Sequence, residues 1–341
     1  MTPDLDNGAD MADSGTTVVI TGGTAGIGRA TARRFARDGA RIALLARDSD
    51  RLEATRKELD EMGATVLALP TDVADPDRVE AAAQAVEEGL GEIDIWINDA
   101  MVTIYAEFLD IDPEEFRRAT EVTYLGTVWG TRAALQRMVP RDRGTVVQVG
   151  SAMAYRSIPL QSPYCGAKHA IKGLTESVLT ELKHRGSNVH ITMVQLPGLN
   201  TPQFTWGRTK LNRQTMPVPP IYQPEVAADA IHWAAHHRRR QVYVGGSTVY
   251  TILGEKFAPW LADLYLARTA YSGQQTDHPL DPEGHDNLFE PESGDRGAHG
   301  PFDDRAHAHS PQLWLTKRRG PVAVAAAAVS VAAIGVLLRR S

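Results

Sequence analysis

The sequence predicts an α/β fold in which a single doubly wound domain is built on a parallel sheet of seven strands. Two observations support this prediction. Between residues 16 and 246, short runs rich in Val, Ile and Leu alternate with longer segments whose apolar residues recur at helical spacing. A glycine-rich stretch, TGGTAGIG, lies directly between the first apolar run and the first helical segment. Strands that alternate with helices pair in parallel, and the helices cover both faces of the sheet.

Each strand is predicted from a short apolar or β-branched run that is bounded by turn-forming or charged residues. The predicted strands are residues 17–21, 41–46, 65–73, 93–99, 144–151, 190–198 and 241–246. The segments between them carry apolar residues at helical spacing, and several end at a glycine, which is a common helix stop. The predicted helices are residues 29–40, 51–63, 76–91, 113–138, 164–186 and 224–237.

Changes of composition along the chain predict four regions. Residues 1–15 are acidic and polar, with no basic or apolar signal segment, and we expect a disordered leader. The folded domain is expected over residues 16–272. Residues 273–316 are rich in Pro, Gly, Asp and His and poor in apolar residues, so we expect a disordered linker. Residues 317–341 are an apolar run between basic residues, the candidate for a transmembrane anchor.

Bulk composition excludes several classes of protein. The 341 residues carry a net charge of −6, which gives no reason to expect nucleic-acid binding. The single cysteine, Cys165, excludes an intramolecular disulfide, and its place inside a helix favours packing over a redox role. The linker holds five histidines, but their spacings match no tight ligand pattern, so no metal site is predicted there.

The glycine-rich stretch predicts a dinucleotide site. Gly22, Gly26 and Gly28 lie between a strand and a helix, where glycines allow a tight turn and a close approach of the backbone to a pyrophosphate. The N-terminus of the following helix offers free N–H groups to the phosphates. The alternative is an ordinary glycine turn, which the strand before and the helix after make less favourable.

The end of the second strand favours NADP over NAD. In such units an acidic residue at this place binds the ribose hydroxyls of NAD, whereas an Arg accommodates the 2′-phosphate of NADP. Ala46 stands where the acid is expected, Arg47 follows it, and Asp48 falls beyond the strand end. The alternative is that Arg47 is a solvated loop charge.

Three polar residues predict acid–base chemistry at the carboxyl edge of the sheet. Tyr164 and Lys168 are four residues apart, which places them on one helix face. A nearby ammonium and a cationic nicotinamide would lower the high pKa of a phenol and make Tyr164 a usable acid or base. Ser151 follows the fifth strand and could hydrogen-bond a substrate oxygen. A Tyr and a Lys at this spacing also occur on exposed helix faces without function.

Together these features resemble the short-chain dehydrogenase/reductase family, whose domain is of the Rossmann type, over about residues 16–246. The family's TGxxxGxG loop matches Thr21 to Gly28, a stretch that includes Thr24 and Ile27. Its aspartate that contacts the adenine region resembles Asp72, which is followed by Val73.

The later motifs of the family follow in the same order. Its Asn-Asn-Ala-Gly stretch resembles NDAM, from Asn98 through Ala100 to Met101. Its active-site Ser, with Tyr-x-x-x-Lys thirteen residues later, matches Ser151, Tyr164 and Lys168. Its Pro-Gly matches Pro197 and Gly198, and Thr201 corresponds to a Thr that contacts the nicotinamide amide.

The resemblance implies an NAD(P)-dependent oxidoreductase acting on a carbonyl or secondary alcohol. Tyr164 would exchange a proton with the substrate oxygen, Lys168 would bind the nicotinamide ribose and lower the Tyr164 pKa, and Ser151 would orient the substrate. The chain departs from the family pattern at three places. Thr123 replaces an Asn that supports a proton relay, Met101 replaces a Gly, and Thr201 lies one residue closer to the Pro-Gly than is common.

The substrate is not named by the sequence. Residues 199–223 contain Phe204, Trp206, Met216 and Tyr222 and would form a mobile, apolar lid that suits a bulky apolar small-molecule substrate, or else cover the core of the domain. Two other functional readings stay open: a non-catalytic dinucleotide-binding sensor, and a membrane-tethered scaffold. The sequence leaves homo-oligomerisation open.

The tail predicts a membrane location. The run 322–338 has seventeen residues without a charge, which as a helix spans about 25 Å, near the lower limit for crossing a bilayer core. The alternative is an Ala-rich helix that docks on the domain. We expect a membrane-associated enzyme whose catalytic domain lies in the cytoplasm, where NADPH is available.

Overall fold

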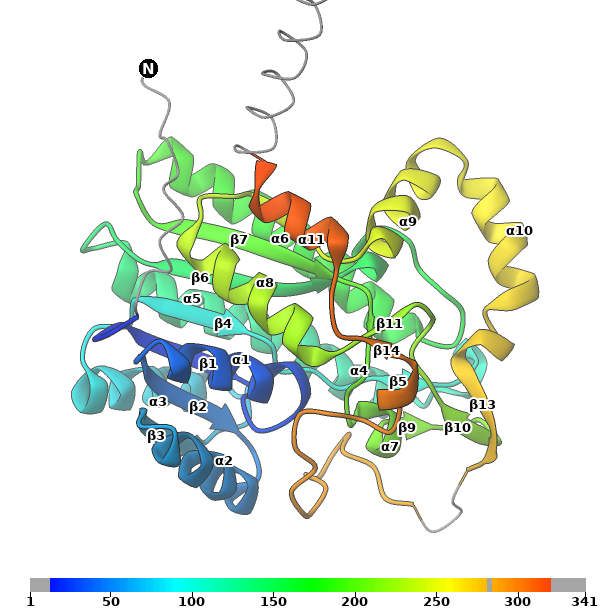
Figure 1. Cartoon of the computed structure of the whole chain (residues 1–341), viewed down its shortest axis with the longest axis horizontal. Coiled ribbons are helices and arrows are strands. Elements are labelled where there is room, and N and C mark those ends of the chain that lie inside the picture. Colours follow the sequence, from blue (N-terminus) through cyan, green and yellow to red (C-terminus); the bar gives the residue numbers. More distant parts are fainter. Residues whose placement is uncertain (1–12, 281–283, 320–341) are drawn as a thin grey trace, which may run out of the picture.

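The structure is a computed structural model that describes residues 13–280 and 284–319. A parallel sheet of seven strands forms its centre, in the order β12-β7-β6-β4-β1-β2-β3 (Figure 1). The strands are β1 (Thr17–Thr21), β2 (Arg41–Ala46), β3 (Thr65–Pro70), β4 (Ile95–Asn98), β6 (Thr145–Ser151), β7 (His190–Leu196) and β12 (Gln241–Tyr243). All seven predicted strands are present. The strand order reverses between β1 and β4, so a crevice for a ligand is expected at their carboxyl ends.

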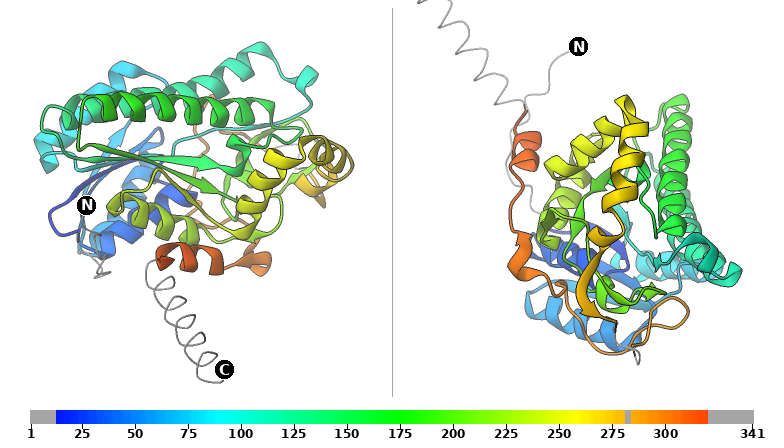
Figure 2. Two further views of the ribbon diagram at one scale, coloured as in Figure 1. Left: turned by 90° about the horizontal axis from the view of Figure 1, so that it is seen from above. Right: turned by 90° about the vertical axis from the view of Figure 1, so that its right-hand side faces the viewer.

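Helices cover both faces of the sheet, as Figure 2 shows with α6 on one side and α8 on the other. The main helices are α1 (Gly26–Arg37), α2 (Ser49–Glu61), α3 (Pro76–Leu90), α4 (Pro113–Thr120), α5 (Gly126–Met138), α6 (Ser162–His184) and α8 (Pro224–His236). Successive strand residues face opposite sides, so Val18 and Ile20 join the core on the side of α1 and α8. Val19 joins the core on the side of α3, α5 and α6.

One predicted helix is interrupted. The segment 113–138 was expected to be continuous, but a π-helical turn, η2 (Glu121–Leu125), separates α4 from α5. The turn contains Thr123, whose hydroxyl donates to the Val102 carbonyl and accepts from the Val102 N–H. π-turns are frequent at functional sites, and this one lies beside the loop that follows β4.

Short elements surround the carboxyl end of the sheet. The strands are β5 (Ile104–Tyr105), β8 (Gly198–Leu199), β9 (Arg208–Thr209), β10 (Arg213–Thr215), β11 (Ile221–Tyr222), β13 (Gln275–Pro279) and β14 (Ala306–His307). The short helices are η1 (Phe108–Asp110), η3 (Ala152–Ala154), α7 (Gln203–Trp206), η4 (Ser272–Gln274), η5 (Asp303–Arg305) and α11 (Pro311–Lys317). In these small sheets β13 pairs with β10, and β14 pairs with β11.

The prediction that residues 273–316 form a disordered linker is wrong for those of them that the structure describes. Its backbone gains partners through β13 and β14, and three apolar side chains, Leu288, Phe302 and Leu313, are buried against the domain. Charged residues that suggested solvation instead form ion pairs, such as that between Asp295 and Arg29. The composition of this segment predicted disorder, because the few residues that anchor it to the domain hardly change its average hydrophobicity.

The ends of the chain were also assigned partly wrongly. Asp13 belongs to the predicted leader, yet it is 1% exposed and pairs with His232. Residues 1–12 of the predicted leader and residues 320–341 of the predicted anchor lie outside the described residues. Within residues 13–280 and 284–319, no helix is both long and apolar enough to cross a membrane.

Two helices stand away from the domain, at the upper right of Figure 1. They are α9 (Gly246–Phe257) and α10 (Pro259–Thr269). Phe257 and Trp260, at the bend between them, are 76% and 69% exposed. Their inner side carries Tyr250 and Tyr265 toward the cavity described below.

Candidate active site

The glycine loop joins three elements at close range. Gly22 has φ +72°, and a Cβ there would lie 2.9 Å from the Ala100 Cα. A Cβ on Gly28 would lie 2.3 Å from the Gly22 carbonyl oxygen, so both positions require glycine. The Thr21 hydroxyl accepts hydrogen bonds from the backbone N–H groups of Asp99 and Ala100. These contacts fix the start of α1 directly above the ends of β1 and β4.

A cavity of about 250 Å³ opens at this edge of the sheet. It brings together seven of the residues predicted from the sequence, namely Ile27, Ser151, Tyr164, Lys168, Pro197, Gly198 and Thr201. Met101, the residue in place of the family's Gly, also lines it. The cavity thus combines the predicted catalytic residues with those expected around a nicotinamide.

The three catalytic candidates line the same cavity, and Tyr164 lies beside both of the others. Ser151, at the end of β6, hydrogen-bonds the Tyr164 hydroxyl. The Lys168 ammonium lies 5.4 Å from the centre of the Tyr164 ring and donates to the Val149 carbonyl at 2.6 Å. Because α6 begins beside the end of β6, Tyr164 and Lys168, four residues apart on one face of α6, lie close to Ser151 at the end of β6. The structure thus places these three side chains together, and their catalytic roles stay predictions.

The charge balance of this group differs from expectation. Burial raises the pKa of Tyr164 well above its usual value, although the hydrogen bond from Ser151 opposes this. Burial also lowers the pKa of Lys168, so desolvation weakens the cation that was expected to favour the phenolate. The raised pKa keeps the Tyr164 hydroxyl protonated at neutral pH.

Asp99 is a member of the site that the sequence reading missed. It is the second residue of NDAM, it lines the cavity, and its carboxylate accepts from the Gly28 N–H at the start of α1. Burial raises its pKa, while the charge of Lys168 acts in the opposite direction. The available signal was an acidic residue in place of an amide within a recognised motif.

Asn98, by contrast, points away from the cavity. Its side chain accepts from the Trp96 indole N–H and donates to Gln148 at 2.9 Å and to Thr131 at 3.1 Å. This buried network ties β4 to β6 and α5. The geometry gives the Asn98 side chain a structural place, whereas its expected contact with the cofactor stays a prediction.

The possible relay residue is also engaged within the protein. The hydroxyl of Thr123 bonds both polar backbone groups of Val102, and its carbonyl accepts from the Thr127 hydroxyl at 3.0 Å. The carbonyl that would hold a relay water thus already accepts one hydrogen bond within the protein. Thr123 instead fixes the loop that carries Asp99 and Met101.

Only some of the residues predicted to form a lid over the substrate line the cavity. Phe204 and Met216 line the cavity, whereas Trp206 packs under the Arg51 guanidinium, 5.0 Å from its ring centre. Cys165 is buried, and burial raises the pKa of its thiol, which agrees with a packed apolar residue. Residues 199–223 were expected either to form a lid over the substrate or to cover the core of the domain, and each expectation holds for some of them.

The remaining predicted cofactor residues lie together on the other side of the glycine loop. Asp72 pairs with Arg118 at 2.6 Å, and Val73 is buried in the core cluster that also contains Val122. Burial lowers the pKa of Arg47, and the positive charges of Arg118 and Arg51 nearby also lower it. Thr24 is buried in the loop itself. This group has the composition expected around an adenosine with a 2′-phosphate.

A segment from the C-terminal part of the chain covers this adenosine side. We call residues 284–300 the strap; it is the orange segment along the lower part of Figure 1. Arg47 donates to the carbonyls of Asn287 and Phe289, and Arg118 donates to that of Leu288 at 3.2 Å. The Gly26 N–H donates to the Gly297 carbonyl at 3.1 Å. The strap was not foreseen, because it comes from the segment predicted to be disordered.

The residues fit a nicotinamide dinucleotide unequally. On the nicotinamide side an open cavity meets Ile27, Lys168 and the Pro197–Gly198 turn. On the adenosine side the donors have the right chemistry, but the strap already satisfies several of them. The chain could hold such a cofactor through these residues once the strap gives way.

Comparisons with known proteins agree with this geometry. The family model for short chain dehydrogenases matches residues 16–210. The chain is 32% identical over 285 residues to the uncharacterized oxidoreductase YxnA of Bacillus subtilis, a match that covers 82% of this chain and 80% of the relative.

Two further comparisons bear on substrate and fold. The chain is 33% identical over 196 residues to 3-dehydrosphinganine reductase of Danio rerio, covering 56% of this chain and 58% of that protein. A short chain dehydrogenase/reductase of Burkholderia phymatum, solved with NAD, superposes with a TM-score of 0.65 and is 22% identical, covering 76% of this chain and 97% of that one. This structure supports the fold.

Proposed function

Because the chain belongs to the short-chain dehydrogenase/reductase family, and is thus an oxidoreductase that uses a nicotinamide cofactor, we propose that it transfers a hydride between NADP and a carbonyl or secondary alcohol. The observation that supports this most is the meeting of Ser151, Tyr164 and Lys168 in one cavity with Ile27 and the Pro197–Gly198 turn. A non-catalytic sensor would have no need of this set.

In the proposed reaction the protein supplies the proton and the orientation. The bound nicotinamide would supply or accept the hydride. Ser151 and Tyr164 would both hydrogen-bond the substrate oxygen, which fixes its distance from the reacting carbon. Tyr164, neutral because it is buried, would give its proton to the oxygen that forms during reduction. Lys168 would then stabilise the phenolate from beside the ring.

The preference for NADP rests on charge around the adenosine side. Arg47, Arg51 and Arg118 lie close enough to influence one another electrostatically, so this side would attract a 2′-phosphate. Asp48, the acid that follows Arg47 in sequence, accepts from the backbone N–H of Arg51 at 2.7 Å and thereby caps α2. A carboxylate used in this way is poorly placed to bind the ribose hydroxyls of NAD.

The proposed substrate is an apolar carbonyl compound. Tyr105, Phe204 and Met216 line the cavity, and α9 and α10 extend its wall with Tyr250 and Leu266. The relative whose name specifies 3-dehydrosphinganine as its substrate gives independent support for an apolar ketone. We further propose that residues 317–341 tether the enzyme to a membrane, with the catalytic domain in the cytoplasm.

The test is NADPH oxidation with a panel of aldehydes, ketones and quinones. Tyr164→Phe should lower turnover at least about 100-fold, because it removes the proton donor and keeps the ring. NADPH binding should largely remain. Tyr155→Phe is the matched control, since Tyr155 bonds Gln241 outside the cavity lining. Equal turnover in wild type and Tyr164→Phe would show that the protein is not an enzyme of this mechanism.

A further inference from the structure

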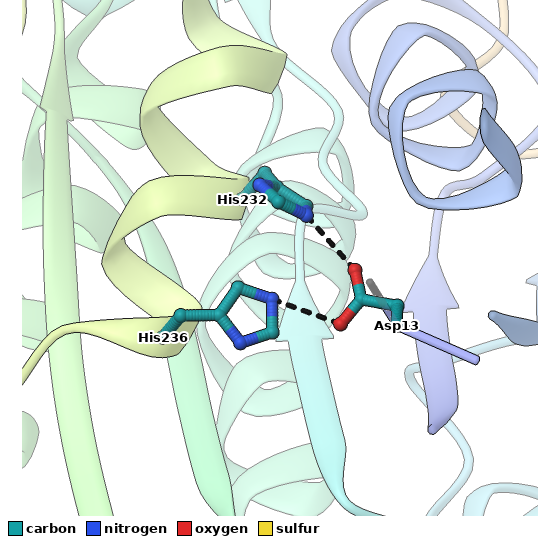
Figure 3. A group of neighbouring side chains, drawn as sticks. All are labelled: Asp13, His232 and His236. Carbon is teal, nitrogen blue, oxygen red and sulfur yellow. Dashed lines mark hydrogen bonds and ion pairs between the residues drawn. The ribbon is translucent and has the colours of Figure 1, made fainter. Parts of the chain in front are cut away.

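Four side chains converge at the opposite edge of the sheet from the active site. Asp13 precedes β1, Asp38 follows α1, and His232 and His236 lie one turn apart on α8 (Figure 3 shows Asp13 and both histidines). The Nε2 of His232 is 2.8 Å from Asp13 Oδ2 and 3.0 Å from Asp38 Oδ2. The Nε2 of His236 is 3.0 Å from Asp13 Oδ1. Carboxylates from the segment before β1 and from the end of α1 thus meet imidazoles of α8.

The cluster has more acceptor atoms than protons to share. His232 has one Nε2 position for two carboxylate oxygens, and the buried Nε2 of His236 makes no well-aligned hydrogen bond. Asp13, with 2% of its side chain exposed, directs one carboxylate oxygen to each imidazole.

We propose that Asp13, Asp38, His232 and His236 bind one divalent transition-metal ion of the zinc class. Two imidazoles and two carboxylates are a borderline donor set that suits zinc, and histidines four apart on a helix present their Nε2 atoms to the same ion. Ligands about 2.0–2.2 Å from a tetrahedral ion lie roughly 3.3–3.5 Å apart. The separations of 2.8–3.0 Å between each imidazole and its carboxylate partners need to widen by a few tenths of an ångström, and the donor atoms of Asp13, His232 and His236 all lie within 4.8 Å of one another.

The site would have a structural role. It would join the segment before β1 to the end of α1 and to α8, far from the cavity at the carboxyl edge. The Phe35 ring lies 4.8 Å from the His232 ring and 6.2 Å from the His236 ring, measured between ring centres, and it forms an apolar wall. Asp38 is further held by Arg34 at 2.5 Å, an outer contact of the kind that orients metal ligands.

The test is titration of chelator-treated, full-length, tag-free protein with Zn²⁺, followed by calorimetry and by the rise in melting temperature. Wild type should bind one equivalent, and Co²⁺ should give the visible absorption of a four-coordinate site. His232→Ala and His236→Ala should each weaken Zn²⁺ binding at least about tenfold. The conservative Asp38→Asn should weaken it as well, which guards against loss of folding in the alanine variants.

His184→Ala is the matched control, because His184 is an exposed histidine at the end of α6. Its Zn²⁺ affinity should equal that of wild type. The proposal is overturned if wild type takes up no Zn²⁺, or if its affinity is unchanged in both His232→Ala and His236→Ala. The cluster would then be an ion-paired clasp of Asp13 between two imidazoles.

A second inference concerns the strap and rests on the proposed function. The strap uses groups that an adenosine phosphate would need. Two guanidinium nitrogens of Arg47 donate to strap carbonyls, and the Gly26 N–H of the glycine loop donates to a third. Leu288 is 0% exposed and belongs to the same apolar cluster as Val73 and Val122, with Ala100 packed against it.

The strap is held closed from outside this groove. Asp295 pairs with Arg29 at 2.5 Å, and Arg29 also bonds Glu58 on α2. Arg29 has only 5% of its side chain exposed, whereas 41% of the Asp295 side chain is exposed. Loss of Asp295 would therefore leave Arg29 with a carboxylate partner and would release the strap without changing a residue expected to touch cofactor.

We infer that the strap competes with the adenosine half of NADPH, so that the cofactor binds only when the strap opens. A protein whose competent state is a minor one shows an apparent affinity reduced by the fraction that is open. Asp295→Ala should therefore tighten NADPH binding roughly threefold or more and speed association. Leu288→Ala should act in the same direction.

Two measurements on the full-length protein decide this. The first is the Kd of NADPH by calorimetry, with Asp304→Asn, an exposed acid outside the strap, as the matched control. The second is hydrogen exchange, in which NADPH should speed exchange over residues 286–297. Weaker binding by Asp295→Ala, or protection of the strap by NADPH, would show that the strap completes the site and would overturn the inference. If neither wild type nor Asp295→Ala binds NADPH or NADH, the proposed function itself fails.

Discussion

A carboxylic acid and an amine share the floor of the cavity, and neither has the protonation behaviour of a solvated group. Burial raises the pKa of Asp99 to about 7, while the charge of Lys168 acts against this rise. Burial lowers the pKa of Lys168 to about 8, and Asp99 acts against that fall. Small changes of pH near neutrality therefore change the charge next to Tyr164.

Asp99→Asn tests this pairing through stability. A carboxyl group whose pKa is raised by folding contributes stability below its unfolded pKa, near 4, and that contribution is lost as the pH rises through about 7. Asparagine does not ionise. Relative to wild type, Asp99→Asn should thus gain on the order of 1–3 kcal/mol between pH 5 and pH 8. Denaturant unfolding at several pH values measures the difference, and a constant difference would contradict the assigned shift.

Arg47→Asp tests the cofactor preference. An acid in place of Arg47 would repel the 2′-phosphate and accept hydrogen bonds from ribose hydroxyls. The ratio of kcat/KM for NADPH to that for NADH should fall at least about tenfold, the scale of one charge-assisted contact. Arg37→Asp, an exposed arginine at the end of α1, should leave the ratio unchanged. A wild type that already prefers NADH would refute the charge argument.

At the scale of elements, the seven strands could be predicted because each is an apolar run closed by turn or charged residues. The interruption of the helix over 113–138 could not. The apolar pattern continues through residues 121–125, and one extra residue in a π-turn changes the hydrogen bonding more than the pattern. The strap could not be predicted either, since its order depends on Leu288 and on partners such as Arg29, 266 residues away from Asp295.

Thr123→Ala tests the role of the π-turn. The Thr123 hydroxyl serves both the N–H and the carbonyl of Val102, and it is buried. Its removal leaves these two groups without this partner in a dry interior, so the free energy of unfolding should fall by about 1–3 kcal/mol. Thr180→Ala, which removes an exposed hydroxyl bonded within α6, should cost less than about 1 kcal/mol. Similar losses in the two variants would mean that the turn needs no such brace.

At the scale of the whole molecule, the candidate site divides into a part that sequence predicts and a part that it does not. Ser151, Tyr164 and Lys168 follow from fixed spacings on elements that must meet. Asp99 and the engaged carbonyl of Thr123 depend on side-chain packing, which a motif does not encode. The arrangement of Asn98 is decided in the same way, by a polar network beneath the sheet edge.

The membrane tether is tested by a form of the protein that ends at Arg319. This end point keeps α11, whose Leu313 is buried and whose Lys317 pairs with Asp229. Full-length protein should pellet with membranes and require detergent for release, whereas the shortened form should stay in the supernatant. Equal unfolding midpoints for both forms would exclude a folding defect. Full-length protein that remains soluble without detergent would count against the tether.

The strap also has a consequence for biosynthesis. Its clasp joins Arg29, which leaves the ribosome early, to Asp295, which is made 266 residues later. At about 5–20 residues per second, that interval lasts roughly 13–53 s. Throughout it, the glycine loop exists on the nascent chain without its cover. The groove is therefore uncovered on the nascent chain until the strap has been made, and only then can the clasp between Arg29 and Asp295 close it.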